Sequence, residues 1–312
     1  MRTRELIRGL ATFVPGLSRR RSITVGGTNS ARYCYSVWLR HLVMAKANGL
    51  NPYPEVVAEL GPGDSLGTGL AALISGCGRY FAFDVAAYAS AERNATIFEE
   101  LVALFRDRTP IPGDDEFPKV KPHLENYAFP AEIFDEQRLR HALDETRLAR
   151  IRESVGDLQR KDSLIQYKAP WSDARSLESE SVDMIMSQAV LEYVDDLRGT
   201  YDSMRAWLKP LGYVSHQIDF KCHGTADEWN GHWAYSDFVW HMIRGKRRYF
   251  LNRQPHSKHV EALETAGFKI VCDRKVTLES RLTLDQLAPR FRSISAEDLT
   301  TSGAFIQAVK AS

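Results

Sequence analysis

The chain has 312 residues, of which 44% are hydrophobic and 26% are charged, and its formal net charge at pH 7 is +1. This length suffices for a full hydrophobic core, and the balance is that of a soluble globular protein with no charge bias toward nucleic acid. No apolar run is long enough to span a bilayer. The four cysteines, Cys34, Cys77, Cys222 and Cys272, are far apart and form no CxxC pair. Their spacing argues against a zinc ribbon or a disulfide scaffold and predicts a reducing, cytoplasmic location.

Residues 1–54 are predicted to form a helical N-terminal appendage. Apolar residues recur at helical spacing from Tyr33 to Lys46, and Pro52 and Pro54 end the segment. Before residue 22, basic side chains surround apolar ones; the basic ones are Arg2, Arg4, Arg8, Arg19, Arg20 and Arg21. We expect either a capping helix with solvated arginines or a basic amphipathic segment that makes peripheral contact with the inner face of an anionic membrane.

From Val56 onward, short apolar stretches alternate with helical ones. The predicted strands are 56–60, 80–83, 164–167, 182–186, 212–218, 268–274 and 304–309. The predicted helices are 66–75, 87–106, 195–208 and 257–266. This alternation predicts an α/β fold with a seven-stranded, mostly parallel sheet, helices on both faces and an antiparallel C-terminal hairpin.

Two long stretches interrupt the alternation, so we predict a domain over 55–312 with insertions at 107–162 and 219–256. The first insertion opens with several prolines and continues as a charged helical run over 131–159. The segment 216–259 holds six of the nine histidines and three of the six tryptophans. Such a concentration of polar aromatic side chains predicts a lid or a substrate pocket.

A glycine-rich turn between the first strand and its helix is the most informative motif. Glu59, Gly61, Gly63 and Ser65 lie in it, and the glycines allow backbone N–H groups to approach a polar ligand closely. Asp84 ends the next strand, where a carboxylate can accept hydrogen bonds from both hydroxyls of a ribose. The pattern predicts a nucleoside cofactor.

Two enzyme classes compete for this turn. A nicotinamide-dependent dehydrogenase needs G-x-G-x-x-G. When the motif starts at Gly61, its third glycine falls on Leu66, so the motif is incomplete. A serine hydrolase would use Ser65 in the G-x-S-x-G sequence that starts at Gly63. Asp219, with His256 or His259, would then complete a Ser-Asp-His order. Against the hydrolase, the motif does not leave the strand directly, no HGGG loop precedes it, and Asp84 has no role in it.

The order of motifs resembles class I S-adenosylmethionine-dependent methyltransferases, with a Rossmann-like sheet. Four segments carry the resemblance, namely Glu59-x-Gly61-x-Gly63, Asp84, residues 181–192 and the Leu208-Lys209-Pro210 turn. The resemblance implies S-adenosyl-L-methionine as cofactor, with Glu59 at its ammonium and Asp84 at its ribose. It also places Ser65, Ser187 and Gln188 at the cofactor, and Trp171 either against adenine or in the core.

The chain is similar overall to bacterial methyltransferases that modify small molecules or surface polysaccharides, so we expect O-methylation of a hydroxyl on a small molecule or glycan. A histidine suits removal of the hydroxyl proton at neutral pH. His216 is the first candidate base, followed by His223 and His232, and Asp219 could orient one of them. Trp229, His232 and Trp233 are the predicted substrate-binding residues. A cofactor-binding protein without catalysis is a further alternative.

Two other kinds of partner are not expected. His216, Asp219 and His223 are the right types of metal ligand, as is the pair Asp195-Asp196. Strand alternation places residues 216 and 219 on opposite faces, and Asp195-Asp196 opens a helix whose dipole favours acids, so no metal site is predicted. The fourth strand ends in Ser187-Gln188 and lacks the Asn-Pro-Pro-Tyr and Pro-Cys motifs of nucleic-acid methyltransferases. This argues against nucleic acid as the acceptor.

Overall fold

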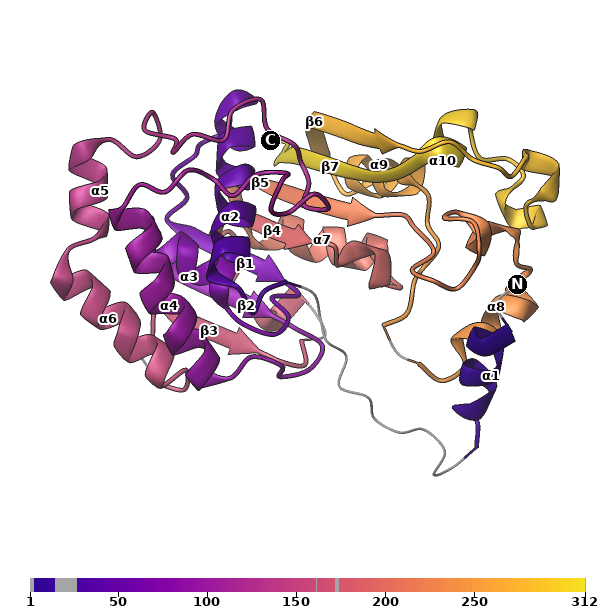
Figure 1. The fold of residues 1–312 in the computed structure, drawn as a ribbon, viewed down its shortest axis with the longest axis horizontal. Coiled ribbons are helices and arrows are strands. Elements are labelled where there is room, and N and C mark those ends of the chain that lie inside the picture. Colours follow the sequence, from indigo (N-terminus) through magenta and orange to yellow (C-terminus); the bar gives the residue numbers. More distant parts are fainter. Residues whose placement is uncertain (1–2, 15–26, 161, 172–173, 248, 312) are drawn as a thin grey trace.

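The computed structural model describes residues 3–14, 27–160, 162–171, 174–247 and 249–311. In this part of the chain, seven strands form one sheet in the order β3-β2-β1-β4-β5-β7-β6 (Figure 1). The strands are β1 (Val56–Leu60), β2 (Arg79–Phe83), β3 (Ile165–Lys168), β4 (Val182–Gln188), β5 (Leu208–Asp219), β6 (Phe268–Thr277) and β7 (Thr301–Lys310). Only β7 runs antiparallel to its neighbours. The predicted α/β class, the seven strands and the closing hairpin are confirmed.

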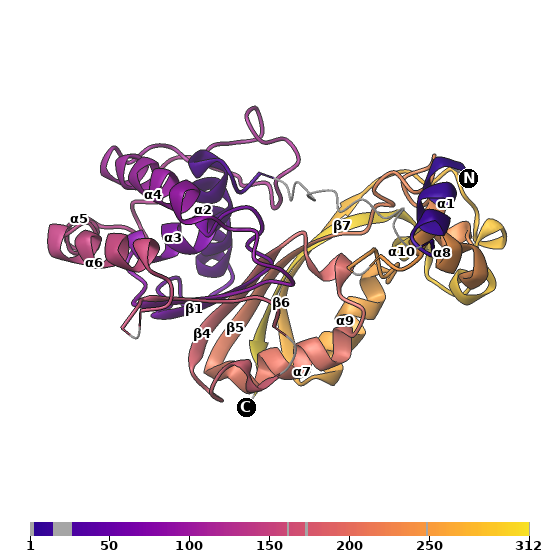
Figure 2. The same ribbon diagram turned by 90° about the horizontal axis from the view of Figure 1, so that it is seen from below.

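Helices cover the two faces of the sheet unequally (Figure 2). One face carries α2 (Ala31–Ala47), α3 (Gly67–Ile74), α4 (Ala91–Arg106), α5 (Glu136–Ala142) and α6 (Glu145–Gly156). The other carries α7 (Leu197–Trp207) and α9 (His256–Thr265). Because each of β1, β2 and β4 is largely buried, the strands read as continuous apolar runs, as in parallel sheets generally.

The charged run predicted over 131–159 is two helices rather than one. Helix α6 has its own N-cap, because the Asp144 side chain accepts from the backbone N–H groups of Thr146 and Arg147. Leu143 is the C-cap of α5. A capping aspartate satisfies N–H groups that have no partner within the helix, and so it starts a new helix inside a helix-prone sequence.

Helix α2 belongs to the main core, although residues 1–54 were expected to form an appendage. Trp38 is fully buried and its indole N–H donates to Ser75 Oγ at 2.8 Å. On the same helix, the buried Arg40 guanidinium donates to the carbonyl oxygens of Pro112, Val120 and Pro122 at 2.8 to 3.2 Å. Helix α2 therefore organises the start of the first insertion, and residue 54 does not mark an edge of the core.

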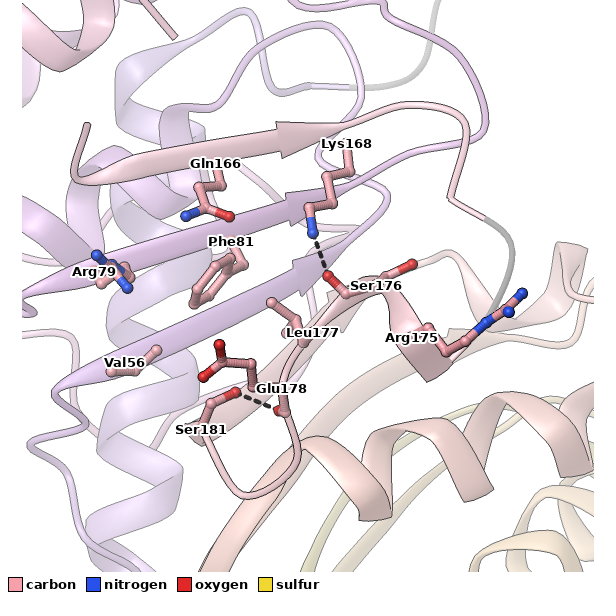
Figure 3. Close-up of a pocket in the computed structure, with 10 residues that line it drawn as sticks. All are labelled: Val56, Arg79, Phe81, Gln166, Lys168, Arg175, Ser176, Leu177, Glu178 and Ser181. Carbon is pink, nitrogen blue, oxygen red and sulfur yellow. Dashed lines mark hydrogen bonds between the residues drawn. The ribbon is translucent and has the colours of Figure 1, made fainter. Parts of the chain in front are cut away.

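The connection from β3 to β4 leaves part of the sheet without a helix. Within 162–171 and 174–181, the helical part is one short turn, Ala174–Ser176. A hollow of about 310 Å³ lies there between the sheet and residues 175–181 (Figure 3). Its walls include Val56 and Arg79 at the starts of β1 and β2, so it extends away from the edge where those strands end.

Helices α1 (Thr3–Ala11) and α8 (Asp237–Arg244) lie side by side at the other end of the molecule (Figures 1 and 2). A Cβ atom on Gly9 would lie 2.1 Å from the Met242 carbonyl oxygen, so only glycine permits this close crossing. Among the described residues, none of the helices has both the length and the apolar character that crossing a bilayer requires. The arginine run 19–21 lies outside the described residues.

Candidate active site at the carboxyl edge of the sheet

The glycine turn lies at the edge where parallel strands β1, β2 and β4 end together. Leu60 pairs with Phe83 on one side and Ser187 on the other. Gly61 and Gly63 have φ angles of +67° and +75°, a backbone region that glycine adopts without strain. The sequence therefore folds here into a tight turn that leads toward α3, as the motif predicts.

Asp84 lies directly beside this turn. Its carboxylate accepts from the backbone N–H of Gly63 at 3.2 Å and from that of Val85 at 2.6 Å. The residue is 5% exposed, and burial raises the pKa of the carboxyl from its usual value. An acceptor group held at the turn by two backbone donors fits the ribose of a nucleoside cofactor.

Glu59 lies under the turn and contacts protein groups. Its carboxyl group is 2% exposed and accepts from the Tyr80 hydroxyl at 2.5 Å. Burial raises the pKa of Glu59 to about 7, and hydrogen bonds from Tyr80 and Thr68 oppose the shift. Glu59 therefore supports the turn from below, and contact with the cofactor ammonium, directly or through water, stays a prediction.

Ser65 does not have the surroundings of a nucleophile. Its hydroxyl donates to the Thr28 carbonyl oxygen and accepts from the backbone N–H of Gly67 at 3.1 Å. His256 instead pairs with Asp273, with 2.9 Å between Nε2 and Oδ1. His259 Nδ1 lies 3.4 Å from the Tyr201 hydroxyl. The Ser-Asp-His arrangement that a hydrolase requires is not assembled from these residues, so the hydrolase interpretation is not favoured.

Two further predicted cofactor residues, Ser187 and Gln188, contact neighbouring protein groups. Ser187 Oγ lies 2.8 Å from His216 Nδ1, and Gln188 Oε1 lies 3.1 Å from His41 Nε2. Gln188 also donates to the Lys121 carbonyl oxygen at 3.4 Å, which ties the first insertion to the end of β4.

Trp171 follows β3 and lies near Asp84, since its backbone N–H donates to the Asp84 carbonyl oxygen at 3.2 Å. Its ring packs 5.8 Å from Phe83 and 5.7 Å from Trp207. The ring is partly buried in the core on the α7 side of the sheet. This packing is the core role that the sequence left open, and contact with adenine stays a prediction.

His216 is too deeply buried to act on an acceptor. It is 0% exposed within β5, and its ring lies 6.0 Å from Tyr201 on α7. Burial lowers the pKa of His216 to about 3, so the ring stays neutral. The first choice of base is therefore corrected: this histidine fills the core under α7.

The predicted substrate residues of the second insertion also form core. Trp233 is 0% exposed and donates from Nε1 to the Arg253 carbonyl oxygen at 2.9 Å. His232 is 2% exposed and stacks on Trp233 with 5.0 Å between ring centroids. Trp229 is partly buried and donates to the Glu279 carbonyl oxygen at 2.9 Å. These three side chains hold the insertion together and do not present a binding wall.

His223, Asp219 and Tyr193 form one hydrogen-bonded chain where β4 and β5 end. His223 Nε2 lies 3.3 Å from Asp219 Oδ2, and His223 Nδ1 lies 2.5 Å from the Tyr193 hydroxyl. Burial acts to raise the pKa of Asp219, but the His223 hydrogen bond and the Lys221 charge leave it lowered. Burial raises the pKa of Tyr193, so the phenol keeps its proton. A carboxylate, an imidazole and a phenol in sequence can pass a proton.

Glu192, beside Tyr193, is a residue that sequence analysis missed. It is 2% exposed, and neither carboxyl oxygen has a hydrogen-bond partner among the described residues. Burial raises the pKa of Glu192 well above its usual range, and the nearby Asp219 carboxylate adds to the shift. The pKa of Asp219 is thus lowered while the pKa of Glu192 is raised, a separation typical of functional acid pairs. The sequence signal that could have identified Glu192 was its position in the segment that follows the fourth strand.

Comparison with known proteins agrees with this geometry. A family model described as a methyltransferase domain matches residues 143–215. A search of curated proteins finds no significant match. Within the ranges the structure describes, no three histidine, cysteine, aspartate or glutamate side chains come together as metal ligands.

Solved structures with a similar fold include an S-adenosylmethionine-dependent methyltransferase from Mesorhizobium loti, with 13% identity, a TM-score of 0.42, and coverage of 91% of this chain and 100% of that one. Phosphoethanolamine N-methyltransferase 2 from Haemonchus contortus has 15% identity and a TM-score of 0.42, covering 92% of this chain and 61% of that one. The [4+2]-cyclase SpnF has 13% identity and a TM-score of 0.41, covering 88% and 80%.

The sheet order, the glycine turn with Asp84 and the matched domain together define an enzyme that binds a nucleoside cofactor and transfers a one-carbon group. The methyltransferase-domain match over residues 143–215 and the sheet order support a class I S-adenosylmethionine-dependent methyltransferase.

Proposed function

We propose that the protein transfers a methyl group to a hydroxyl of a small molecule or glycan, at the place where β4 and β5 end. The observation that carries the proposal is the chain from Asp219 through His223 to Tyr193. It lies at the carboxyl edge of the sheet, where open α/β sheets bind their ligands. A hydroxyl acceptor needs a proton acceptor of this kind, whereas a neutral amine does not.

The residues of the turn hold the cofactor. S-adenosyl-L-methionine, when bound, supplies a methyl group on a sulfonium. Asp84 binds the ribose hydroxyls through its carboxylate, and the backbone of Gly61 and Gly63 allows close approach of the methionine end. The loop after β4 lies over this turn, because a Cβ atom on Gly61 would lie 2.5 Å from Val190 Cγ2. This cover helps exclude water from the site.

The acceptor proton passes along the His223 chain. Asp219 accepts from the protonated Nε2, which leaves Nδ1 free to accept from the Tyr193 hydroxyl. The Tyr193 oxygen would accept the proton of the acceptor hydroxyl while its own proton moves to His223 Nδ1. The bound cofactor would supply the methyl group and, once its sulfur–methyl bond is broken, would leave as S-adenosylhomocysteine. Asp219 then stabilises the charged imidazolium.

The test is a methyl-transfer assay that detects S-adenosylhomocysteine, run with free sugars, nucleotide sugars and phenols as acceptors. His223→Gln should lower kcat by about 100-fold and leave S-adenosylhomocysteine binding unchanged, while His141→Gln on the exposed surface of α5 serves as the matched control. Full activity of His223→Gln would contradict the proposed base. Cofactor binding without transfer to any acceptor would instead favour the non-catalytic alternative.

We also propose that the reaction takes place in the cytoplasm. The four cysteines are buried and none forms a disulfide. Free thiols in this number support a reducing compartment. Cell fractionation with an antibody against the chain would test it, and recovery of the protein outside the cytoplasm and its membrane surface would contradict it.

A further inference from the structure

We propose that α1 and the start of α8 form a surface that docks the protein onto an anionic lipid bilayer. The surface consists of Ile7, Leu10, Val14 and Phe238, here called the outer patch. These side chains are 61%, 37%, 47% and 75% exposed. They are four of the eight large hydrophobic residues that are exposed in the described chain. Large apolar side chains exposed together on two packed helices point to an interaction site.

Three members of the outer patch lie on the N-terminal segment. Ile7 and Leu10 are three positions apart on α1, which places them on a common face of the helix. Val14 lies just beyond the end of α1 at Ala11. Ile7 and Leu10 thus form an exposed apolar stripe, and Val14 adds a third exposed apolar side chain after the helix ends.

The opposite side of α1 already packs against α8. Gly9 crosses the α8 backbone, Leu6 packs against the cluster that contains Trp240 and Ile243, and Glu5 pairs with Arg247 at 3.3 Å. An amphipathic helix normally buries its apolar face in its own protein. Here α1 attaches through a glycine and a short inward side, so the apolar stripe faces away from the protein.

Phe238 extends the patch onto α8. The Phe13 ring lies 5.9 Å from the ring of His241, which is one turn along α8 from Phe238. Lys246 Nζ lies 5.8 Å from the Phe13 ring. The contacts through Phe13 thus join the segment before Val14 to α8 and to the residues just after it, and Phe238 lies one turn before His241.

Basic residues border the outer patch and decide its partner. Arg4 and Lys246 are exposed, and the Arg8 side chain is 39% exposed. Cations around an apolar surface suit a bilayer that carries negative headgroups. A second copy of the chain would bring the same positive charges together and would be repelled. The charge pattern therefore favours anionic lipid over self-association.

The experiment is flotation of the full chain with vesicles of phosphatidylcholine, with and without phosphatidylglycerol. The wild type should bind the anionic vesicles and lose binding as salt is raised. The double variant Leu10→Ser, Phe238→Ser should bind about tenfold more weakly or worse, because two large apolar side chains no longer enter the bilayer. S-adenosylhomocysteine binding, measured in parallel, should not change, which separates this proposal from the catalytic one.

The matched control is Leu211→Ser with Leu278→Ser, since these side chains are 77% and 44% exposed elsewhere on the chain. The control should bind vesicles as the wild type does. Three results would overturn the proposal: no binding to anionic vesicles, equal binding without phosphatidylglycerol, or equal losses in variant and control. Sedimentation velocity completes the test, since a wild-type dimer that the double variant converts to monomer would identify a second copy as the partner instead.

Discussion

Tyr80 on β2 and Glu59 on β1 meet under the glycine turn, where the phenol donates to the carboxyl group at 2.5 Å. Both residues are buried, at 0% and 2% exposure. The Tyr80 ring also packs against Gly69 of α3 so closely that a Cβ atom there would lie 1.9 Å from Tyr80 Cζ. One aromatic side chain thus joins two strands to the helix that follows the turn.

Glu59→Gln should flatten the pH dependence of stability. Burial raises the pKa of Glu59 from 4.5 to about 7, so folding favours the protonated form. The resulting stabilisation is complete below pH 4.5 and is lost as pH rises through 7. A shift of this size corresponds to about 3 kcal/mol. Urea unfolding at pH 5 and pH 8.5 measures the free energy of unfolding at each pH. Between them the wild type should lose about 3 kcal/mol more than the variant. Equal losses in the two proteins would contradict the prediction.

Gly69→Ala should destabilise the fold by about 2–4 kcal/mol, because the added methyl group collides with the Tyr80 ring. The matched control is Gly156→Ala near the end of α6, where a Cβ atom would meet nothing within 4 Å. That change should stabilise by about 0.5–1 kcal/mol through helix propensity. Urea denaturation midpoints measure both, and equal effects at the two positions would refute the packing argument.

Asp84→Asn should weaken S-adenosylhomocysteine binding by about tenfold or more, or about 1.4 kcal/mol, because the amide offers one acceptor oxygen where the carboxylate offers two. Ser65→Ala is the comparison, since Ser65 Oγ hydrogen-bonds to protein groups, namely the Gly67 N–H and the Thr28 carbonyl oxygen. Isothermal titration should find its affinity within a few-fold of the wild type. Similar affinities for all three proteins would remove Asp84 from the cofactor site.

Glu192→Met should stabilise the fold yet lower turnover. Neither carboxyl oxygen has a hydrogen-bond partner in the described part of the chain, so an apolar side chain of similar volume relieves a desolvation cost of about 1–3 kcal/mol. If the Glu192 carboxyl group contacts the acceptor, its removal should lower kcat or raise KM. Thermal unfolding and methyl-transfer kinetics on the same preparation decide the point. A stabilised variant with unchanged kinetics would show that Glu192 has no role at the site.

The elements around the cofactor could be predicted because each depends on local signals. The alternation of apolar strands with helices predicts the sheet. The two glycines after the first strand predict the turn, and both have positive φ in the structure. Asp84 followed from its place at the end of a strand. These features depend on residues that are close together in the sequence, and so they could be predicted from it.

The base and the substrate residues could not be predicted reliably, because their roles depend on where each side chain points and on contacts between residues far apart in the sequence. His216 and His223 are both near the end of β5, yet one points into the core under α7 and the other pairs with Asp219. Counting histidines and tryptophans identified the second insertion as unusual. It could not distinguish a pocket from a small aromatic core, because Trp233 would be expected in either.

Arg40 shows how the first insertion must be treated if the protein is re-engineered. Its wholly buried guanidinium holds three carbonyl oxygens of that loop and stands 4.9 Å from the Tyr127 ring. Anyone who exchanges this loop between related enzymes to change acceptor preference would need to move the arginine with it. A transplanted loop without Arg40 would lose its anchor, and a helix that kept Arg40 without this loop would bury a charge that has lost these carbonyl partners. Arg40 and the loop therefore form one exchangeable unit, although 72 to 82 residues of chain separate the hydrogen-bonded positions.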